Sequence, residues 1–154
     1  MDDEHKPRPF LRTPFNETDG RFSPDGRWIA YVSDESGRFE VYVRSFVESG
    51  EAVRHQISTA GGLSPRWRRD GRELFFVASD QKMMAVPVRT GASFEAGAPV
   101  ALFRTGTVVV SGPRATADYD VSADGQRFLI TRSIVAENLL PLTAVVNWTQ
   151  DLKR

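Results

Sequence analysis

The sequence contains one short pattern three times: a short predicted strand, a tight turn that ends in Asp-Gly, and a longer apolar strand. The three copies cover residues 21–32, 66–77 and 120–131. Their turns hold Asp25-Gly26, Asp70-Gly71 and Asp124-Gly125. An internal repeat constrains the fold strongly, because each copy must form the same unit and bury its apolar surface against its neighbours.

The residue types in each turn explain why the chain reverses direction there. In Ser23-Pro24-Asp25-Gly26, proline presets φ at the first central position of a type I turn, and Asp suits the second position. Glycine then takes the left-handed position that follows. The other two copies keep Asp-Gly and lack the proline. We therefore expect positive φ at Gly26, Gly71 and Gly125.

The spacing of the repeats predicts the architecture. The Asp-Gly pairs lie 45 and 54 residues apart, and a four-stranded propeller blade takes about 40–50 residues. Strand signals are frequent, and no stretch shows a sustained 3.6-residue period with helix caps. The predicted class is all-β, a β-propeller segment of about three four-stranded antiparallel blades. Any helix is expected to be short, as in the connection at 134–139.

The strand pattern also predicts the boundaries. The propeller segment covers 9–148, with a mobile tail at 1–8 and a second tail at 149–154. Blade one takes 20–58, blade two takes 63–103, and a partial blade three of three strands takes 118–148. Residues 9–13 are expected to form a spare outer strand that has no blade of its own.

Composition excludes several classes of partner. The chain has 154 residues, with 20 basic and 20 acidic side chains and no cysteine. The balanced charge gives no reason to expect binding of nucleic acid. No apolar run reaches the ~18–20 residues that a transmembrane helix needs. The charged start at residues 1–6 has no apolar core of a signal peptide. We expect no membrane contact by this segment, and the compartment stays open.

The first repeat resembles a known family. Phe22–Ser33 followed by Glu40–Val43 resembles the PD-type, WD-like repeats of TolB-like β-propellers. The order of further segments is similar to the C-terminal propeller region of bacterial serine/threonine protein kinases; these segments are Pro14–Glu17, Pro65–Gly71, Met84–Val88 and Val145–Thr149. The resemblance implies closure at six blades, of which this chain would hold half, and binding of a protein or peptide at one face or along the channel. It also implies a kinase domain far upstream and, in a receptor-type kinase, an extracytoplasmic location.

No catalytic motif is present in the sequence. Phosphoryl transfer needs a Gly-rich phosphate loop, His-Arg-Asp and Asp-Phe-Gly, and the chain has none of them. Ser64 and Ser111 lack the neighbours of a Gly-x-Ser-x-Gly elbow. We expect no enzyme activity in this chain and no cofactor.

Metal binding is also not expected. Asp120, Ser122, Asp124 and Gly125 match the start of an EF-hand calcium loop, but Thr131 stands where that loop needs a bidentate Glu. The equivalent turns in the other two copies favour a hairpin. The two histidines, His5 and His55, have no evident partners for a metal site or a triad.

The candidate binding residues come from the innermost strands, which line the channel of a propeller. Equivalent channel-side positions hold Arg21, Arg66 and Asp120, and Asp19 and Asp118 precede two of them. The alternative is that these five residues form salt bridges between blades. The arginines around Trp67, at positions 66, 68, 69 and 72, are expected to form a solvated turn, while Trp67 aligns with Phe22 and Val121 as inter-blade core.

These observations favour a non-catalytic interaction module that binds a protein, peptide or small ligand. The alternatives are a C-terminal sensor of a larger receptor-type kinase and a truncated remnant. The remaining blades are expected either upstream in a longer polypeptide or in a second copy, each copy lending residues 9–13 to the other's blade three.

Overall fold

The computed structural model describes residues 9–46, 52–106, 118–131 and 142–146. These residues contain no helix, and all their paired strands are antiparallel. The strands are β1 (Glu17–Phe22), β2 (Trp28–Ser33), β3 (Glu40–Ser45), β4 (Arg54–Gln56), β5 (Gly62–Trp67), β6 (Glu73–Ala78), β7 (Lys82–Arg89), β8 (Glu95–Ala96), β9 (Val100–Arg104), β10 (Tyr119–Val121), β11 (Arg127–Thr131) and β12 (Leu142–Val146). The expected tails and the connection at 134–139 lie outside the described residues.

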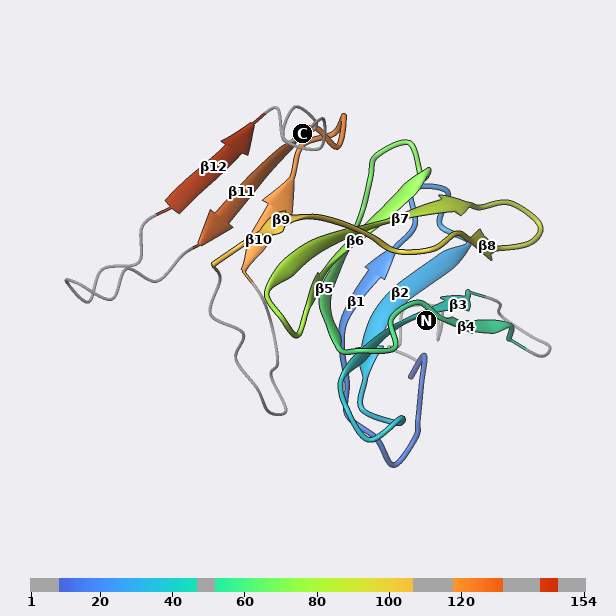
Figure 1. Cartoon of the computed structure of the whole chain (residues 1–154). Helices are drawn as coiled ribbons and strands as arrows, with labels where there is room; N and C mark the ends of the chain where they lie inside the picture. The colour runs from blue at the N-terminus through green and yellow to red at the C-terminus, as the bar shows by residue number, and fades with distance from the viewer. Residues whose placement is uncertain (1–8, 47–51, 107–117, 132–141, 147–154) are drawn as a thin grey trace, which may run out of the picture.

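The strands follow one another as three consecutive meanders, as the repeats predicted (Figure 1). Blade one is β1-β2-β3-β4, blade two is β5-β6-β7 with β9 paired to β7, and blade three is β10-β11-β12. The all-β propeller segment is thereby confirmed. One strand was not predicted: β8 pairs with the end of β7 through two residues only.

The three Asp-Gly turns have the same geometry. Gly26, Gly71 and Gly125 each have a φ of 71°. Each glycine N–H donates to the carbonyl three residues earlier, at 2.8, 2.9 and 2.8 Å. In each turn the Asp carboxylate also accepts from the N–H two residues later, at 3.1, 3.1 and 3.0 Å. The predicted positive φ is confirmed at all three positions.

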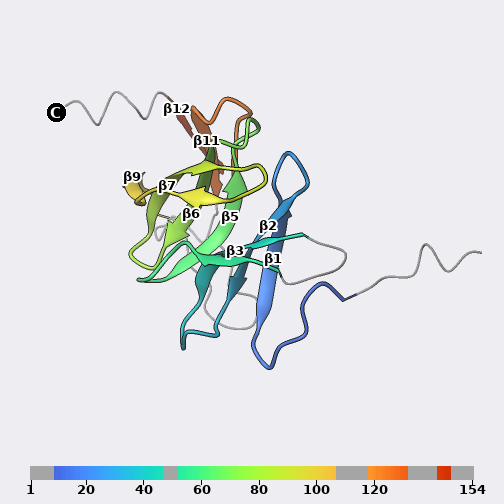
Figure 2. The ribbon, with the colours of Figure 1, turned by 90° about the vertical axis from the view of Figure 1, so that its right-hand side faces the viewer.

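The three sheets stack face to face, with blade two in the middle (Figure 2). Successive side chains of a strand point to opposite faces, and β6 shows this directly. Its Leu74 and Phe76 lie in a core cluster shared with blade one. Its Phe75 and Val77 lie in a second cluster shared with blade three. Because both faces are covered, these four residues are at most 2% exposed.

The outer faces of blades one and three differ from this middle sheet. We call the side of blade one that carries Phe22, Ile29 and Tyr31 the leading face, and the side of blade three that carries Leu129 the trailing face. Phe22 is 57% exposed and Leu129 is 42% exposed. Both lie on the sheet faces that point away from blade two.

Two expectations about blade one need correction. Residues 9–13 form no strand in the described part of this chain, because a strand needs a partner edge and two blades separate this segment from blade three. Instead, the Phe10 ring lies 5.8 Å from that of Phe46. Strand β1 also begins at Glu17 rather than at residue 20, since a bulge between Thr18 and Arg21 lengthens it.

No helix in the described ranges has both the length and the apolar character that crossing a bilayer requires.

Candidate functional site

The candidate site lies on the innermost strands, where β5 lies between β1 and β10 (Figure 1). Strands β1 and β5 each contain a bulge, between Thr18 and Arg21 and between Leu63 and Arg66. Within the bulges, Asp19 has a φ of 51° and Ser64 has a φ of 53°. A non-glycine residue in this region costs about 1–3 kcal/mol and persists only where its surroundings fix it.

Arg66 makes contacts with all three blades. Its Nη1 donates to both carboxylate oxygens of Asp19 in blade one, at 3.2 and 3.1 Å. The same nitrogen donates to the carbonyl of Pro65 in blade two at 2.8 Å. Its guanidinium lies over the Tyr119 ring of blade three, 5.5 Å from the centroid. Arg66 therefore holds the inner ends of the three blades together.

Arg21 joins the same cluster from blade one. Its Nη2 lies 2.9 Å from Asp19 Oδ1, so two guanidinium groups share one carboxylate. The side chains of Asp19, Arg66 and Arg21 are 8%, 19% and 48% exposed. The Trp67 indole N–H of blade two donates to the Arg21 carbonyl at 3.0 Å. The cluster is partly shielded from water and carries a surplus positive charge.

Tyr119 is a site residue that the sequence did not reveal. Its hydroxyl is buried and has no hydrogen-bond partner within the described ranges. Burial, the largest influence, raises the pKa of this phenol above its ordinary value. The hydroxyl therefore stays protonated and can donate a hydrogen bond. A buried aromatic in a short strand looks like core in a sequence, so no sequence pattern identifies this role.

Asp118 and Asp120 do not join the arginine cluster. Both are exposed. The Asp120 carboxylate accepts from the N–H of Val121 at 2.8 Å, and the Asp118 carbonyl accepts from Thr131 at 3.0 Å. Of the five candidates, Asp19, Arg21 and Arg66 are joined by ion pairs, and no ion pair within the described ranges includes Asp118 or Asp120.

The arginines around Trp67 were expected to form a solvated turn, and this is wrong for two of them. Arg66 is tied to Asp19, and Arg68 pairs with Glu73 at 2.9 Å, with 29% of its side chain exposed. Their positions in β5 and directly after it place them between blades. Arg69 and Arg72 are exposed, as expected. Trp67 and Val121 pack against the two core clusters, as expected, but Phe22 is 57% exposed because no blade of this chain lies on its side of blade one.

A buried carboxylate lies elsewhere in the fold. Glu40 is 1% exposed and accepts hydrogen bonds from the Ser58 hydroxyl and from the Gly61 N–H, the latter at 2.9 Å. These contacts tie the start of β3 to the connection into blade two. Satisfied buried carboxylates of this kind position the backbone, so we assign Glu40 a structural role.

His55 is packed among aromatic rings. His55 lies on β4, with its ring 5.0 Å from Phe94 and 6.1 Å from Trp28. No group of three or more His, Asp or Glu side chains in the described part of the chain could hold a metal ion. His5 and Ser111 lie outside that part.

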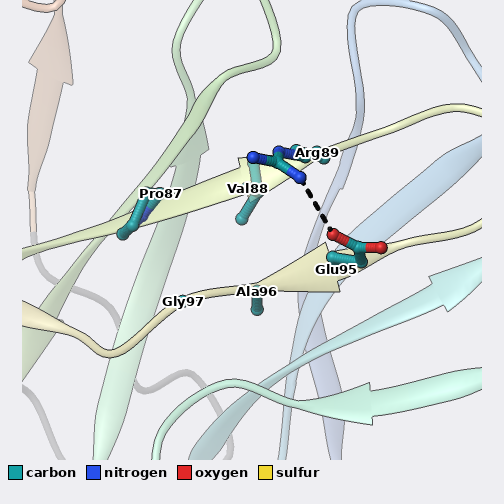
Figure 3. A pocket seen from close by; sticks show the side chains of 6 residues that line it. All are labelled: Pro87, Val88, Arg89, Glu95, Ala96 and Gly97. Carbon is teal, nitrogen blue, oxygen red and sulfur yellow. Dashed lines mark ion pairs between the residues drawn. The ribbon is translucent and has the colours of Figure 1, made fainter.

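A surface hollow of about 380 Å³ lies between β7 and β8 (Figure 3). It is lined by Pro87, Val88, Arg89, Glu95, Ala96 and Gly97. Its ion pair, Arg89 to Glu95 at 3.6 Å, is largely exposed, and exposed pairs contribute only about 0–1 kcal/mol. We therefore place the candidate site at the inner strands and not here.

Comparison with known proteins gives partial similarity. No family model matches the chain. A stretch of 72 residues, 46% of the chain, is 35% identical to the uncharacterized peptidase YuxL of Bacillus subtilis (strain 168) and spans only 11% of that protein. TolB from Acinetobacter baumannii is similar in structure over 94% of this chain and 44% of its own, with a TM-score of 0.47 and 18% identity. A putative 6-phosphogluconolactonase from Bacteroides uniformis is similar over 88% of this chain and 42% of its own, with a TM-score of 0.46 and 16% identity. The propeller assignment rests on the three blades themselves.

Proposed function

We propose that the chain is a non-catalytic β-propeller interaction module whose inner strands bind a carboxylate-bearing segment of a protein or peptide. The observation that supports this most is the pair of arginines that share Asp19. Among the described residues, the hydrogen bonds from the Arg66 side chain to Asp19 and Pro65 all come from Nη1. Arg21 contacts Asp19 through Nη2.

The unused donors define the chemistry of the ligand. A guanidinium has five N–H donors in a planar fork, and it binds carboxylates through two parallel hydrogen bonds. One carboxylate cannot satisfy two such groups, so the cluster keeps donors and one positive charge for a partner. The strained backbone at Asp19 is consistent with a binding role, because strain is often stored at functional sites.

The proposal is tested with a labelled acidic octapeptide rich in Asp and Glu, and with the same peptide in which Asn and Gln replace those residues. Fluorescence anisotropy should show binding of the acidic peptide only, and Arg66→Gln should weaken it at least tenfold, or about 1.4 kcal/mol. Arg66→Lys keeps the charge without the fork and should lose part of the affinity. Arg69→Gln, on an exposed turn, is the matched control.

Two outcomes contradict the proposal. Equal binding of the charged and uncharged peptides would exclude carboxylate recognition. No binding of either peptide at about 1 mM, where affinity is only about 4 kcal/mol, would exclude the site as assigned. Circular dichroism of each variant separates a loss of binding from a loss of folding, because Arg66 also joins blades one and two.

The second candidate function is that of a regulatory segment in a longer bacterial receptor-type serine/threonine kinase. It is favoured by the order of segments from Pro14–Glu17 to Val145–Thr149, which is similar to the propeller regions of such proteins. The coding sequence upstream should then encode a kinase domain. The 154-residue chain alone should neither hydrolyse ATP nor transfer phosphate, and measured activity would contradict this assignment.

A further inference from the structure

We propose that the trailing face of one chain binds the leading face of a second copy of the same chain. Asp118 of each copy then pairs with Arg21 of the other, and two chains close one six-bladed ring. This inference concerns assembly; it uses Arg21, one of the two arginines of the peptide site proposed above, and leaves the unused donors of Arg66 to that site.

The junction between blades one and two inside the chain shows the contact that we propose between the two copies. Where blade one meets blade two, Asp19 pairs with Arg66 at 3.1 Å. When the three Asp-Gly turns are aligned, Asp118 is the counterpart of Asp19, and Arg21 is the counterpart of Arg66. The chain therefore carries the acidic partner of this ion pair at one end of the arc and the basic partner at the other end.

Both residues are available for a new contact. The Arg21 side chain is 48% exposed and meets Asp19 through only one of its nitrogens. Asp118 is exposed, and no side chain in the described ranges pairs with its carboxylate. Asp120, also exposed, adds negative charge beside it. The two ends of the arc are thus complementary in charge at the level of the inner strands.

The leading and trailing faces also expose apolar residues whose counterparts in blade two pack between blades. Phe22, 57% exposed, is the counterpart of Trp67, which packs into the core between blades one and two. Leu129, 42% exposed, is the counterpart of Phe75, which is fully buried between blades two and three. Each end therefore exposes a side chain whose counterpart is covered wherever a neighbouring blade is present.

The number of blades in a closed propeller determines how many copies of the chain the ring would hold. Propellers have typically four to eight blades, and copies of a three-blade unit reach a closed ring in this range only at six. Two chains related by a two-fold axis make two identical junctions. In the single chain, Phe10 and Leu11 cover part of the leading face. A hollow of about 360 Å³ lies there, and its lining includes Phe10, Leu11, Ile29 and Tyr31. On closure this segment moves to the outer edge of the partner's blade three.

Sedimentation velocity of the full 154-residue chain tests the proposal, and a dimer is expected. Asp118→Arg and Arg21→Asp should each raise the dimer Kd at least tenfold, because each places like charges together at both junctions. Mixing these two variants should restore the dimer, since both junctions of the mixed pair then match Arg with Asp. The variant Arg69→Asp is the matched control and should dimerise like the parent.

A monomeric parent chain would overturn the proposal. So would a dimer that is unaffected by either reversal, or a mixture of the two variants that associates no better than each variant alone. Thermal unfolding of the separate variants excludes misfolding as the cause, and the double variant Phe22→Lys with Leu129→Asp gives a second route to the same monomer.

Discussion

The two junctions between blades are built from the same repeat and yet differ in the contacts that their described residues make. Among the described residues, the core cluster between blades one and two has twelve buried members, and that between blades two and three has eight. The first also has the Asp19–Arg66 ion pair and the hydrogen bond from Trp67 to Arg21. The second has the contact of Arg66 with the Tyr119 ring. Repetition of a sequence pattern therefore does not give equal interfaces, and blade three should separate first.

The described part of the second junction contains several aromatic rings. Phe128 lies at its centre, with ring centroids 5.1 Å from Phe75 and 5.4 Å from Phe103. Both pairs are T-shaped, a favoured arrangement of aromatic rings. The first junction combines aromatic residues such as Trp28 and Phe94, whose rings lie 5.3 Å apart, with aliphatic residues such as Val43. Because Phe128 is the larger side chain, its loss should harm the second junction more than the loss of Val43 harms the first.

The largest expected effect is from Phe128→Ala. It should lower the free energy of unfolding by about 3–5 kcal/mol, because it removes a fully buried ring and leaves a cavity. Val43→Ala, at the first junction, should cost about 2 kcal/mol, since it removes only two methyl groups. Urea denaturation followed by tryptophan fluorescence measures both, and equal losses would remove the contrast between the junctions.

The next effect compares two turn glycines that share a φ of 71°. A Cβ added at Gly26 meets nothing within 4 Å, whereas one at Gly125 lies 3.1 Å from Arg68 Cδ and 3.3 Å from Phe75 Cζ. Gly26→Ala should cost about 1–2 kcal/mol from backbone strain alone. Gly125→Ala should cost about 1 kcal/mol more, because it also pushes against blade two. Thermal unfolding would contradict this if the two variants melted together.

A smaller effect is expected from removal of the ion pair at the first junction. Asp19→Asn should cost about 1–3 kcal/mol, because it leaves Arg66 partly buried without its carboxylate. Asp120→Asn, on an exposed strand, should change stability by less than about 0.5 kcal/mol. If chemical denaturation gave the same small change for both, Asp19 would not hold the blades together.

The smallest effect concerns acid stability. The Ser122 hydroxyl and then the Gln126 N–H lower the pKa of Asp124 below its ordinary value of 3.8. A carboxylate with a lowered pKa in the folded state stabilises the fold above its ordinary pKa, and this is lost as the pH falls through the lower value. Asp124→Asn and Ser122→Ala should both flatten the decrease in Tm below about pH 4. An unchanged acid limb in both variants would contradict the role of this turn.

Much of the fold follows from the sequence because local chemistry determines it. Asp-Gly fixes the turns, and alternation along β6 places Leu74 and Phe75 on opposite faces whatever lies farther away. What depends on distant segments could not be predicted in this way. Residues 9–13 are not a strand in this chain because no partner edge is near, and β8 forms because a neighbouring part of β7 was left unpaired.

The candidate site was predicted only in part, for the same reason. Equivalent positions in the repeat identified Arg21 and Arg66, since repeats place equivalent residues at the same depth in each blade. The convergence on Asp19 depends on a backbone bulge, and the buried hydroxyl of Tyr119 depends on how blade three packs. Neither has a local sequence signal.

Native-state hydrogen exchange tests most directly the claim that blade two is enclosed between two unequal junctions. Amides of β6, buried on both faces, should exchange only through global unfolding, and those of β10 and β11 should exchange through a lower-energy opening in which blade three separates. The amides of β2 and β3 should stay close to β6 in protection. Exchange in β6 as fast as in the two-residue strand β8, or protection in blade three equal to that in blade one, would contradict the account.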